Sequence, residues 1–206
     1  MSVRTWATGA HSLHPRFQPP KSTFEPVPPT FKHLQDRLGS VKNAYLHPYG
    51  LGKENKSTQI TYYGDDLSFL STVNYAVQTH LPSTLMPIEI RRGDDILKEI
   101  DVARIDFLKL DIEGMEIDAL HGFEQALSER RIGFIQFEHH PGQVLLKSFY
   151  DLLSRHGFHL GKMYAGYIDF SEYHVSFERY AGPNYFALPS SRTDLIARLS
   201  KGYRHR

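Results

Sequence analysis

The hydrophobic pattern changes its period within residues 105–127, which read IDFLKLDIEGMEIDALHGFEQAL. Ile105–Ile112 is rich in apolar residues, and a short run of this kind close to a glycine is typical of a strand buried on both faces. After the acidic residues that follow it, apolar residues recur at helical spacing, at Ile117, Leu120, Phe123 and Leu127. This stretch therefore predicts a strand, an acidic turn and a helix, around which we expect the fold to be organised.

Strand and helix patterns alternate along the rest of the chain. Strands are predicted up to Glu25, where prolines follow, and at residues 43–52, 58–63, 86–91, 132–137, 158–163 and 185–188. Helices are predicted from a Thr30 cap to Gly39, at residues 93–100 and 144–155, and in the tail. This alternation predicts an α/β sandwich with a mostly parallel sheet. The last two strands have no helix between them, which predicts an antiparallel edge hairpin.

The ends of the chain differ from its middle. Residues 1–22 contain three prolines and no periodic apolar pattern, which predicts an irregular N-terminal arm, with a short strand at Val3–Ala7 as the alternative. Residues 23–190 form the predicted catalytic domain, and residues 191–206 a basic C-terminal tail.

Composition narrows the class of protein. With 206 residues and a net charge of +1, we expect one domain and neither nucleic acid nor a membrane as partner. The absence of cysteine excludes disulfides and thiolate metal sites, and it fits a reducing compartment. No apolar run approaches the roughly 18 residues of a membrane span, so we predict a cytoplasmic protein. The sequence does not determine the oligomeric state.

The acidic turn is the strongest candidate for a reactive site. Ligands of open parallel sheets bind at the carboxyl ends of strands, and Asp111, Glu113 and Glu116 lie there. Crowded carboxylates repel one another unless they face water, a ligand or a cation. Asp111 is the predicted base or orienting group, and Glu113 is predicted to hold a substrate hydroxyl or to raise the pKa of Asp111. For Glu116 we favour a simple role at the positive end of the helix dipole.

Two other acidic positions have alternative interpretations. Glu25 ends a strand before a helix, where doubly wound folds hold ribose hydroxyls, but this position alone favours the simpler interpretation, an exposed acid beside a proline turn. The sequence Glu138-His139-His140 contains good metal ligands, but adjacent residues at a strand end point in different directions and no further ligand is suitably spaced. We therefore predict no metal site, and expect His139 or His140 to line an acceptor pocket.

Several of these segments together resemble the FkbM-type family of S-adenosylmethionine-dependent methyltransferases. The similar blocks are Phe24-Glu25-Pro26, Tyr49-Gly50-Leu51-Gly52, the central segment from Leu108 to Gly122, and Ile135-Gln136-Phe137-Glu138. The resemblance implies a Rossmann-like class I methyltransferase sheet, S-adenosylmethionine as methyl donor, and O-methylation of a sugar or another small metabolite. It implies Glu25, Gly50 and Asp111 as cofactor-binding residues. With it, Asp111, Glu113 and His139 become the predicted catalytic residues.

One family feature has no counterpart in the sequence. The family's first strand and its glycine-rich loop, Asp-x-Gly-Ala-Asn-x-Gly, are not found in residues 1–23. We therefore expect a sheet without its first strand and weak binding of S-adenosylmethionine. This departure keeps a second hypothesis open, a non-catalytic or truncated methyltransferase-like remnant that acts as an interaction module. A metal-dependent hydrolase using Asp111, Glu138 and His139 is the third.

Overall fold

The computed structural model describes residues 3–6, 21–64, 81–139, 141–179 and 184–201. Its strands are β1 (Val3–Trp6), β2 (Lys21–Phe24), β3 (Ala44–His47), β4 (Gly50–Gly52), β5 (Lys56–Tyr62), β6 (Thr84–Arg92), β7 (Ile105–Leu110), β8 (Ile132–Glu138), β9 (Phe158–Tyr164), β10 (Tyr167–Asp169) and β11 (Asn184–Pro189). Its helices are α1 (Pro28–Leu38), α2 (Gly93–Glu99), α3 (Glu116–Gly122), α4 (Glu124–Ser128), α5 (Leu146–Arg155), the 3₁₀ helix η2 (Val175–Arg179) and α6 (Thr193–Ser200).

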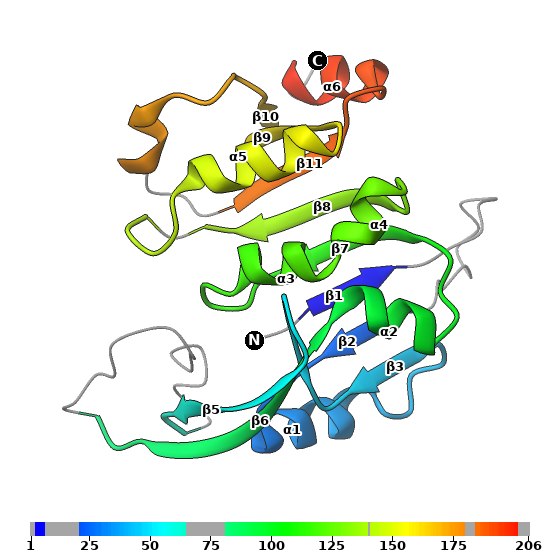
Figure 1. Cartoon of the computed structure of the whole chain (residues 1–206), viewed down its shortest axis with the longest axis vertical. Coiled ribbons are helices and arrows are strands. Elements are labelled where there is room, and N and C mark those ends of the chain that lie inside the picture. The colour runs from blue at the N-terminus through cyan, green and yellow to red at the C-terminus, as the bar shows by residue number, and fades with distance from the viewer. Residues whose placement is uncertain (1–2, 7–20, 65–80, 140, 180–183, 202–206) are drawn as a thin grey trace.

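The elements form two sheets (Figure 1). The larger sheet has eight strands in the order β10-β9-β11-β8-β7-β1-β2-β3, and the smaller has the order β4-β6-β5. In the larger sheet β2 is parallel to β3 and β7 is parallel to β8, whereas β11 is antiparallel to both β8 and β9. The α/β class and the antiparallel pairing of the last two predicted strands are therefore confirmed, but the sheet is mixed and not mostly parallel, because five of the seven strand pairs described in it are antiparallel. The predicted strand at residues 43–52 is two strands, β3 and β4, one in each sheet.

Residues 3–6 form β1, which confirms the alternative prediction of a short strand at Val3–Ala7, whereas residues 7–20 of the predicted irregular arm lie outside the described residues. β1 lies between β2 and β7 and is antiparallel to both, with Val3 opposite Phe24 and Trp6 opposite Phe107. It occupies the mid-sheet position that we expected to be empty. An empty position there would leave backbone N–H and C=O groups unpaired on both β2 and β7, which is energetically costly. The four residues of β1 pair with both strands. Because β1 is antiparallel, it is not an equivalent of the family's first strand.

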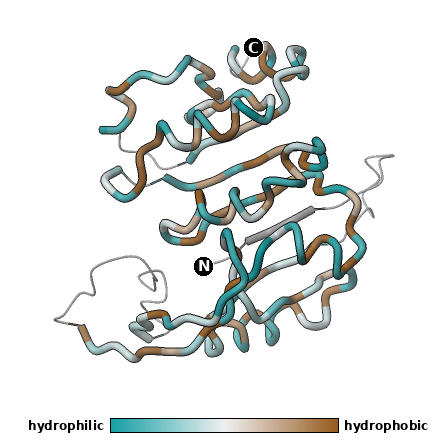
Figure 2. The backbone as a smooth tube through the Cα atoms, in the orientation of Figure 1, coloured by the Kyte–Doolittle hydropathy of each residue, from teal (hydrophilic) through white to brown (hydrophobic). Residues whose placement is uncertain are grey.

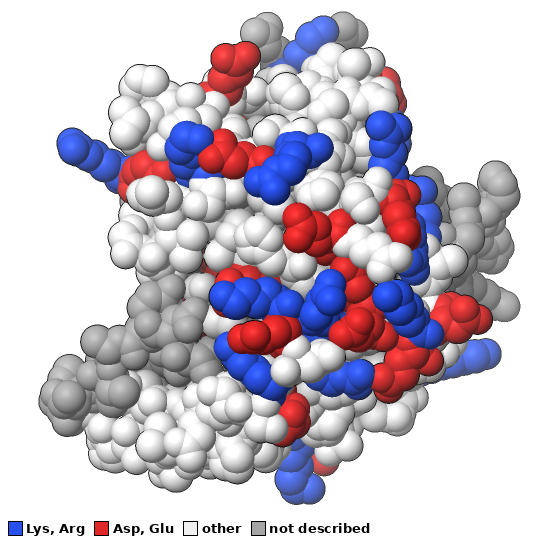
Figure 3. Space-filling view, in the orientation of Figure 1, with Lys and Arg blue, Asp and Glu red and all other residues white. Residues whose placement is uncertain are grey.

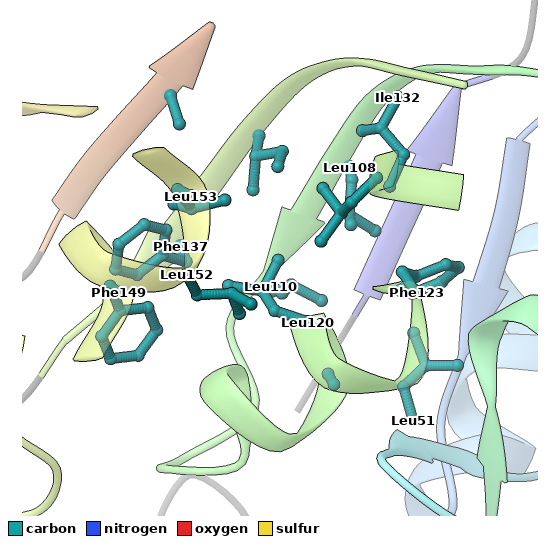
Figure 4. Packing of buried hydrophobic residues seen from close by; sticks show 14 of the residues in the cluster. Leu51, Leu108, Leu110, Leu120, Phe123, Ile132, Phe137, Phe149, Leu152 and Leu153 are labelled. Carbon is teal, nitrogen blue, oxygen red and sulfur yellow. The ribbon is translucent and has the colours of Figure 1, made fainter. Parts of the chain in front are cut away.

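The core lies between the larger sheet and the helices in front of it. Leu110 and Phe137 extend from the central strands, and Leu120 and Phe149 meet them from α3 and α5 (Figure 4). The rings of Phe137 and Phe149 stack with centroids 4.4 Å apart. In Figure 2, apolar residues recur along β8 and alternate with hydrophilic residues along α3 and α5. These central strands are rigidly packed, so the loops at their carboxyl ends are well supported.

Two local differences from the predicted helices have simple causes. The first helix begins at Pro28 and not after a Thr30 cap, because proline lacks the N–H that the first turn leaves unpaired. The helix predicted through Leu127 is interrupted at Phe123, which separates α3 from α4. None of the helices in the described residues is both long and apolar enough to cross a membrane. Lys and Arg alternate with Asp and Glu over the helix-covered face, so it carries no extended charge of one sign (Figure 3).

Gly93 and Asp94, the first residues of α2, both contact the segment that begins α4. The carboxylate of Asp94 is 2% exposed and accepts hydrogen bonds from the backbone N–H groups of Gln125 and Ala126, at 2.9 and 3.0 Å. A Cβ atom on Gly93 would lie 2.2 Å from the ring of Phe123. Residue 93 must therefore be glycine to leave room for the Phe123 ring. The Asp94 side chain caps the N-terminus of α4.

We expect Gly93→Ala to lower the free energy of unfolding by about 1–3 kcal/mol, because the added methyl group overpacks the buried Phe123 ring. Urea unfolding would measure the change. Phe123→Leu removes the obstructing ring, so the double variant should show a favourable coupling relative to the sum of the two single changes. Simple additivity would contradict the proposed contact.

Candidate active site

Three acidic residues lie at one edge of the larger sheet. β1 is antiparallel to β2 and to β7, and β7 is parallel to β8, so β2, β7 and β8 run in the same direction. Glu25 follows the last residue of β2, Asp111 follows β7, and Glu138 is the last residue of β8. The carboxyl ends of these strands therefore bring together residues that are far apart in the sequence.

Asp111, Glu113 and Glu138 form an acidic cluster. One carboxylate oxygen from each residue lies within 4.8 Å of the other two. Lys109 Nζ donates a hydrogen bond to Asp111 Oδ2 at 2.6 Å. Burial acts to raise the pKa of Asp111, but hydrogen bonding with Lys109 and Glu138 outweighs it, so this pKa lies below its usual value. The lowered pKa keeps Asp111 ionised, so its carboxylate is available to accept a proton although it is a weak base, and the neighbouring acidic groups can hold hydroxyl groups.

The acidic turn has a constrained backbone. Glu113 and Gly114 have φ angles of 52° and 95°, both in the left-handed region. Ile112 and Met115, on either side of them, are 1% and 3% exposed and belong to the main core. These two apolar side chains anchor the turn and hold Glu113 in a conformation that residues with a side chain rarely adopt.

The buried Glu116 side chain stabilises the acidic turn by a hydrogen bond to its backbone. Its side chain is 3% exposed, and Oε1 accepts a hydrogen bond from the Ile112 backbone N–H at 2.8 Å. Burial raises the pKa of Glu116, and the backbone hydrogen bonds only partly offset that effect. Glu116 therefore fixes the turn, in keeping with the structural role favoured from the sequence.

A pH dependence follows for Glu116. Because its pKa is raised in the folded state, its contribution to stability is fully present below the unfolded value of 4.5 and is lost as pH rises through the folded pKa. We expect Glu116→Gln, which keeps an acceptor for the Ile112 N–H, to be more stable than wild type at pH 7.5. The difference should disappear near pH 4. Urea unfolding at both pH values checks this, and Glu116→Ala, which loses the acceptor, should be destabilised at both.

Glu25 lies deeper in the structure than a typical ligand-binding carboxylate. It is 2% exposed, its Oε1 accepts the Val27 backbone N–H at 2.9 Å, and burial raises its pKa. Gly50 lies close by: a Cβ atom there would lie 2.8 Å from the side chain of Ile90 and 3.3 Å from that of Pro26. Gly50 thus allows β4 to pack closely against the segment after Glu25. Glu25 therefore has almost no exposed surface that a ribose could contact in this structure.

His139 is turned away from the acidic cluster. It is 4% exposed, its Nε2 lies 2.7 Å from the Val144 carbonyl oxygen, and its ring packs against Phe149 and Tyr185. The structure therefore places this predicted catalytic residue in the core, whereas Glu138 takes the position in the site. Strand alternation is the signal that identifies Glu138: it shares a face with Gln136, and its neighbour His139 points the other way. His140 lies outside the described residues.

An apolar cavity of about 320 Å³ lies elsewhere, between α2 and the strands β2 and β3. Phe24, His47, Ile96 and Phe123 are among its lining residues, and the acidic cluster is not. Size alone does not make it the reactive site, because it contains no carboxylate to accept a proton. The chemistry of the described residues is concentrated at the acidic turn.

Comparison with known proteins agrees with this geometry. The family model for the methyltransferase FkbM domain matches residues 16–160, which include all three residues of the acidic cluster. The chain belongs to the FkbM methyltransferase family. The prediction made from its sequence motifs is therefore confirmed.

Relatives of this FkbM chain include two curated proteins that are each 30% identical to it. For Methyltransferase 1 of Beauveria bassiana, the match covers 56% of this chain and 55% of the relative. For the hexuronic acid methyltransferase AglP of Haloferax volcanii, it covers 58% and 46%. The chain thus spans about half the length of these relatives. A solved FkbM methyltransferase from Methylobacillus flagellatus KT is 22% identical, with a TM-score of 0.47 over 80% of this chain and 35% of that one.

Proposed function

We propose that this FkbM-family chain transfers a methyl group from S-adenosylmethionine to a hydroxyl of a sugar or another small metabolite. The observation that supports this most directly is the contact of Asp111 with Glu138 at the carboxyl edge, where an acceptor's proton can be taken up. One curated relative is named a hexuronic acid methyltransferase, which supports a sugar as acceptor. Family membership supports the methyltransferase activity.

The residues fit the methyl donor in part. The negative acidic cluster suits a positively charged sulfonium. The family resemblance assigns Glu25 to the ribose, but Glu25 is 2% exposed and accepts a hydrogen bond from the Val27 N–H. When bound, S-adenosylmethionine would supply an activated methyl group. Residues 1–23 contain no glycine-rich loop for its methionine half, so we expect weak binding.

The chain's own residues then act on the acceptor. The carboxylate of Asp111 would take up the proton of the acceptor hydroxyl, which leaves the acceptor oxygen able to receive the methyl group that a bound donor would supply. Glu113 and Glu138 hold the acceptor's other hydroxyls in line. Positioning contributes most of the rate enhancement in such a displacement, and the base adds roughly 10²–10⁴-fold.

Glu25→Ala should weaken the binding of S-adenosylhomocysteine by about 1.5–3 kcal/mol, the range for hydrogen bonds to a charged group. Isothermal titration calorimetry would measure it, with Glu54→Ala as the control, because Glu54 is an exposed carboxylate that pairs with Lys56. An unchanged affinity would leave Glu25 a structural turn residue.

The function itself is tested with labelled methyl donor. Purified chain is incubated with S-adenosylmethionine carrying a labelled methyl group and with a panel of hexuronic acid glycosides and neutral sugars, and mass spectrometry detects methylated product. Methyl ether formation that depends on Asp111 supports the proposal. No binding of the donor and no product would favour the second hypothesis, a non-catalytic interaction module.

A further inference from the structure

Lys109 is a charged residue in an otherwise apolar part of β7. It lies two residues before Asp111, and its Nζ donates to Asp111 Oδ2 at 2.6 Å. The side chains of Lys109 and Asp111 are 30% and 38% exposed, so water screens this pair only in part. The Lys109–Asp111 hydrogen bond therefore lies inside the site already described. Lys109 was not among the site residues predicted from the sequence.

The surroundings of Lys109 are dominated by negative charge. Within the acidic cluster its ammonium faces Asp111 directly, with Glu113 in the turn and Glu138 on β8 close to Asp111. Lys109 is in register with Gln136 on β8, which is neutral, and with Arg4 on β1, which is positively charged. Without the ammonium, three carboxylates would share one small volume, and repulsion would favour protonation of at least one of them.

A contribution to folding stability explains only weakly why residue 109 is a lysine. Partly exposed ion pairs typically contribute only about 0–1 kcal/mol, and an apolar residue would suit a central strand at least as well. The hydrogen bond does, however, have a geometric effect. It engages Oδ2 of Asp111, and thereby distinguishes the two oxygens of the carboxylate.

We propose that Lys109 is the positioning residue of the acidic site: its hydrogen bond to Oδ2 holds the Asp111 carboxylate in the orientation from which it takes up the acceptor's proton. The inference rests on the proposed methyl transfer. Lys109 touches neither the acceptor nor the methyl group, and it acts only through Asp111. Arginine at this position keeps the charge and the donor, whereas methionine keeps the length and removes both.

The first experiment does not depend on activity. The carboxyl carbon signals of aspartate are followed by NMR as a function of pH in wild type, Lys109→Met and Lys109→Arg. We expect the Asp111 titration midpoint to rise by about one pH unit in Lys109→Met, the size of a lost neighbouring charge, and to return toward wild type in Lys109→Arg. Lys147→Met is the matched control, because Lys147 Nζ pairs with Asp151 at the same 2.6 Å on the surface of α5. An unchanged Asp111 midpoint overturns the proposal.

The second experiment measures methyl transfer. Lys109→Met should lower kcat by roughly 10- to 100-fold, with KM for the acceptor nearly unchanged, and shift the acidic limb of the pH profile upward. Lys109→Arg should recover most of the rate, and Lys147→Met should match wild type. Equal rates in wild type and a folded Lys109→Met overturn the positioning role. Absence of turnover in wild type overturns the proposed function instead, and the NMR result then stands alone.

Discussion

Asp111→Asn is expected to lower the turnover number for methyl transfer by roughly 10²–10⁴-fold, the contribution of a general base. The amide keeps the size of the side chain but has lost the negative charge that accepts the proton. Asp111 is only half-buried and lies outside the main core cluster. The melting temperature of the Asp111→Asn variant should therefore stay close to that of wild type. Turnover is measured with saturating acceptor, and thermal unfolding is followed on the same sample.

A matched control separates chemistry from general electrostatics. Asp151→Asn removes a carboxylate that also pairs with a lysine at 2.6 Å, but on the exposed side of α5. It should change neither turnover nor melting temperature. Glu138→Gln should resemble Asp111→Asn, because Glu138 contacts Asp111 in the cluster. If Asp111→Asn unfolds the protein while its folded fraction remains fully active, the assignment of the base is wrong.

Glu113→Gly is expected to change stability and activity in opposite directions. Glycine adopts the φ of 52° without steric cost, whereas a residue with a side chain pays of order 1 kcal/mol or more there. The free energy of unfolding should therefore rise by about 0.5–1 kcal/mol. Activity should fall by about 10- to 100-fold, because one hydrogen bond from the cluster to the acceptor is lost.

Two comparisons complete this test. Arg130 has nearly the same φ, 55°, at a position outside the acidic cluster, so Arg130→Gly should gain similar stability without losing activity. Glu113→Gln keeps the strained backbone and removes only the charge, so it should lose activity without gaining stability. A Glu113→Gly variant that is both more stable and fully active would exclude Glu113 from the site.

The acidic turn shows how much of the structure can be predicted from the local hydrophobic pattern. Ile105–Leu110 is a strand and Glu116 begins a helix, as the change of hydrophobic period predicted. Period-2 and period-3.6 patterns are properties of neighbouring residues, so a single sequence carries them. The same reasoning places Asp111 at a carboxyl edge, because a parallel sheet has only one such edge. The family motif then identified the FkbM methyltransferase family.

Contacts between distant segments were decided by the tertiary structure. The sequence analysis chose His139 and not Glu138 as a catalytic residue, but alternation in β8 directs His139 into the core and Glu138 to the cluster. Gly93 is required by Phe123, a residue 30 positions later whose ring occupies the space of a Cβ atom.

The sequence by itself determined the order and type of most elements, the acidic turn and the family, because each depends on residues that are close in the chain. Only the tertiary structure decided that β1 fills mid-sheet, that Lys109 engages Asp111 and that Glu138 joins them. Strand partners and side-chain contacts across strands depend on which backbone groups remain unpaired after the rest of the chain has folded, and no local pattern contains that information.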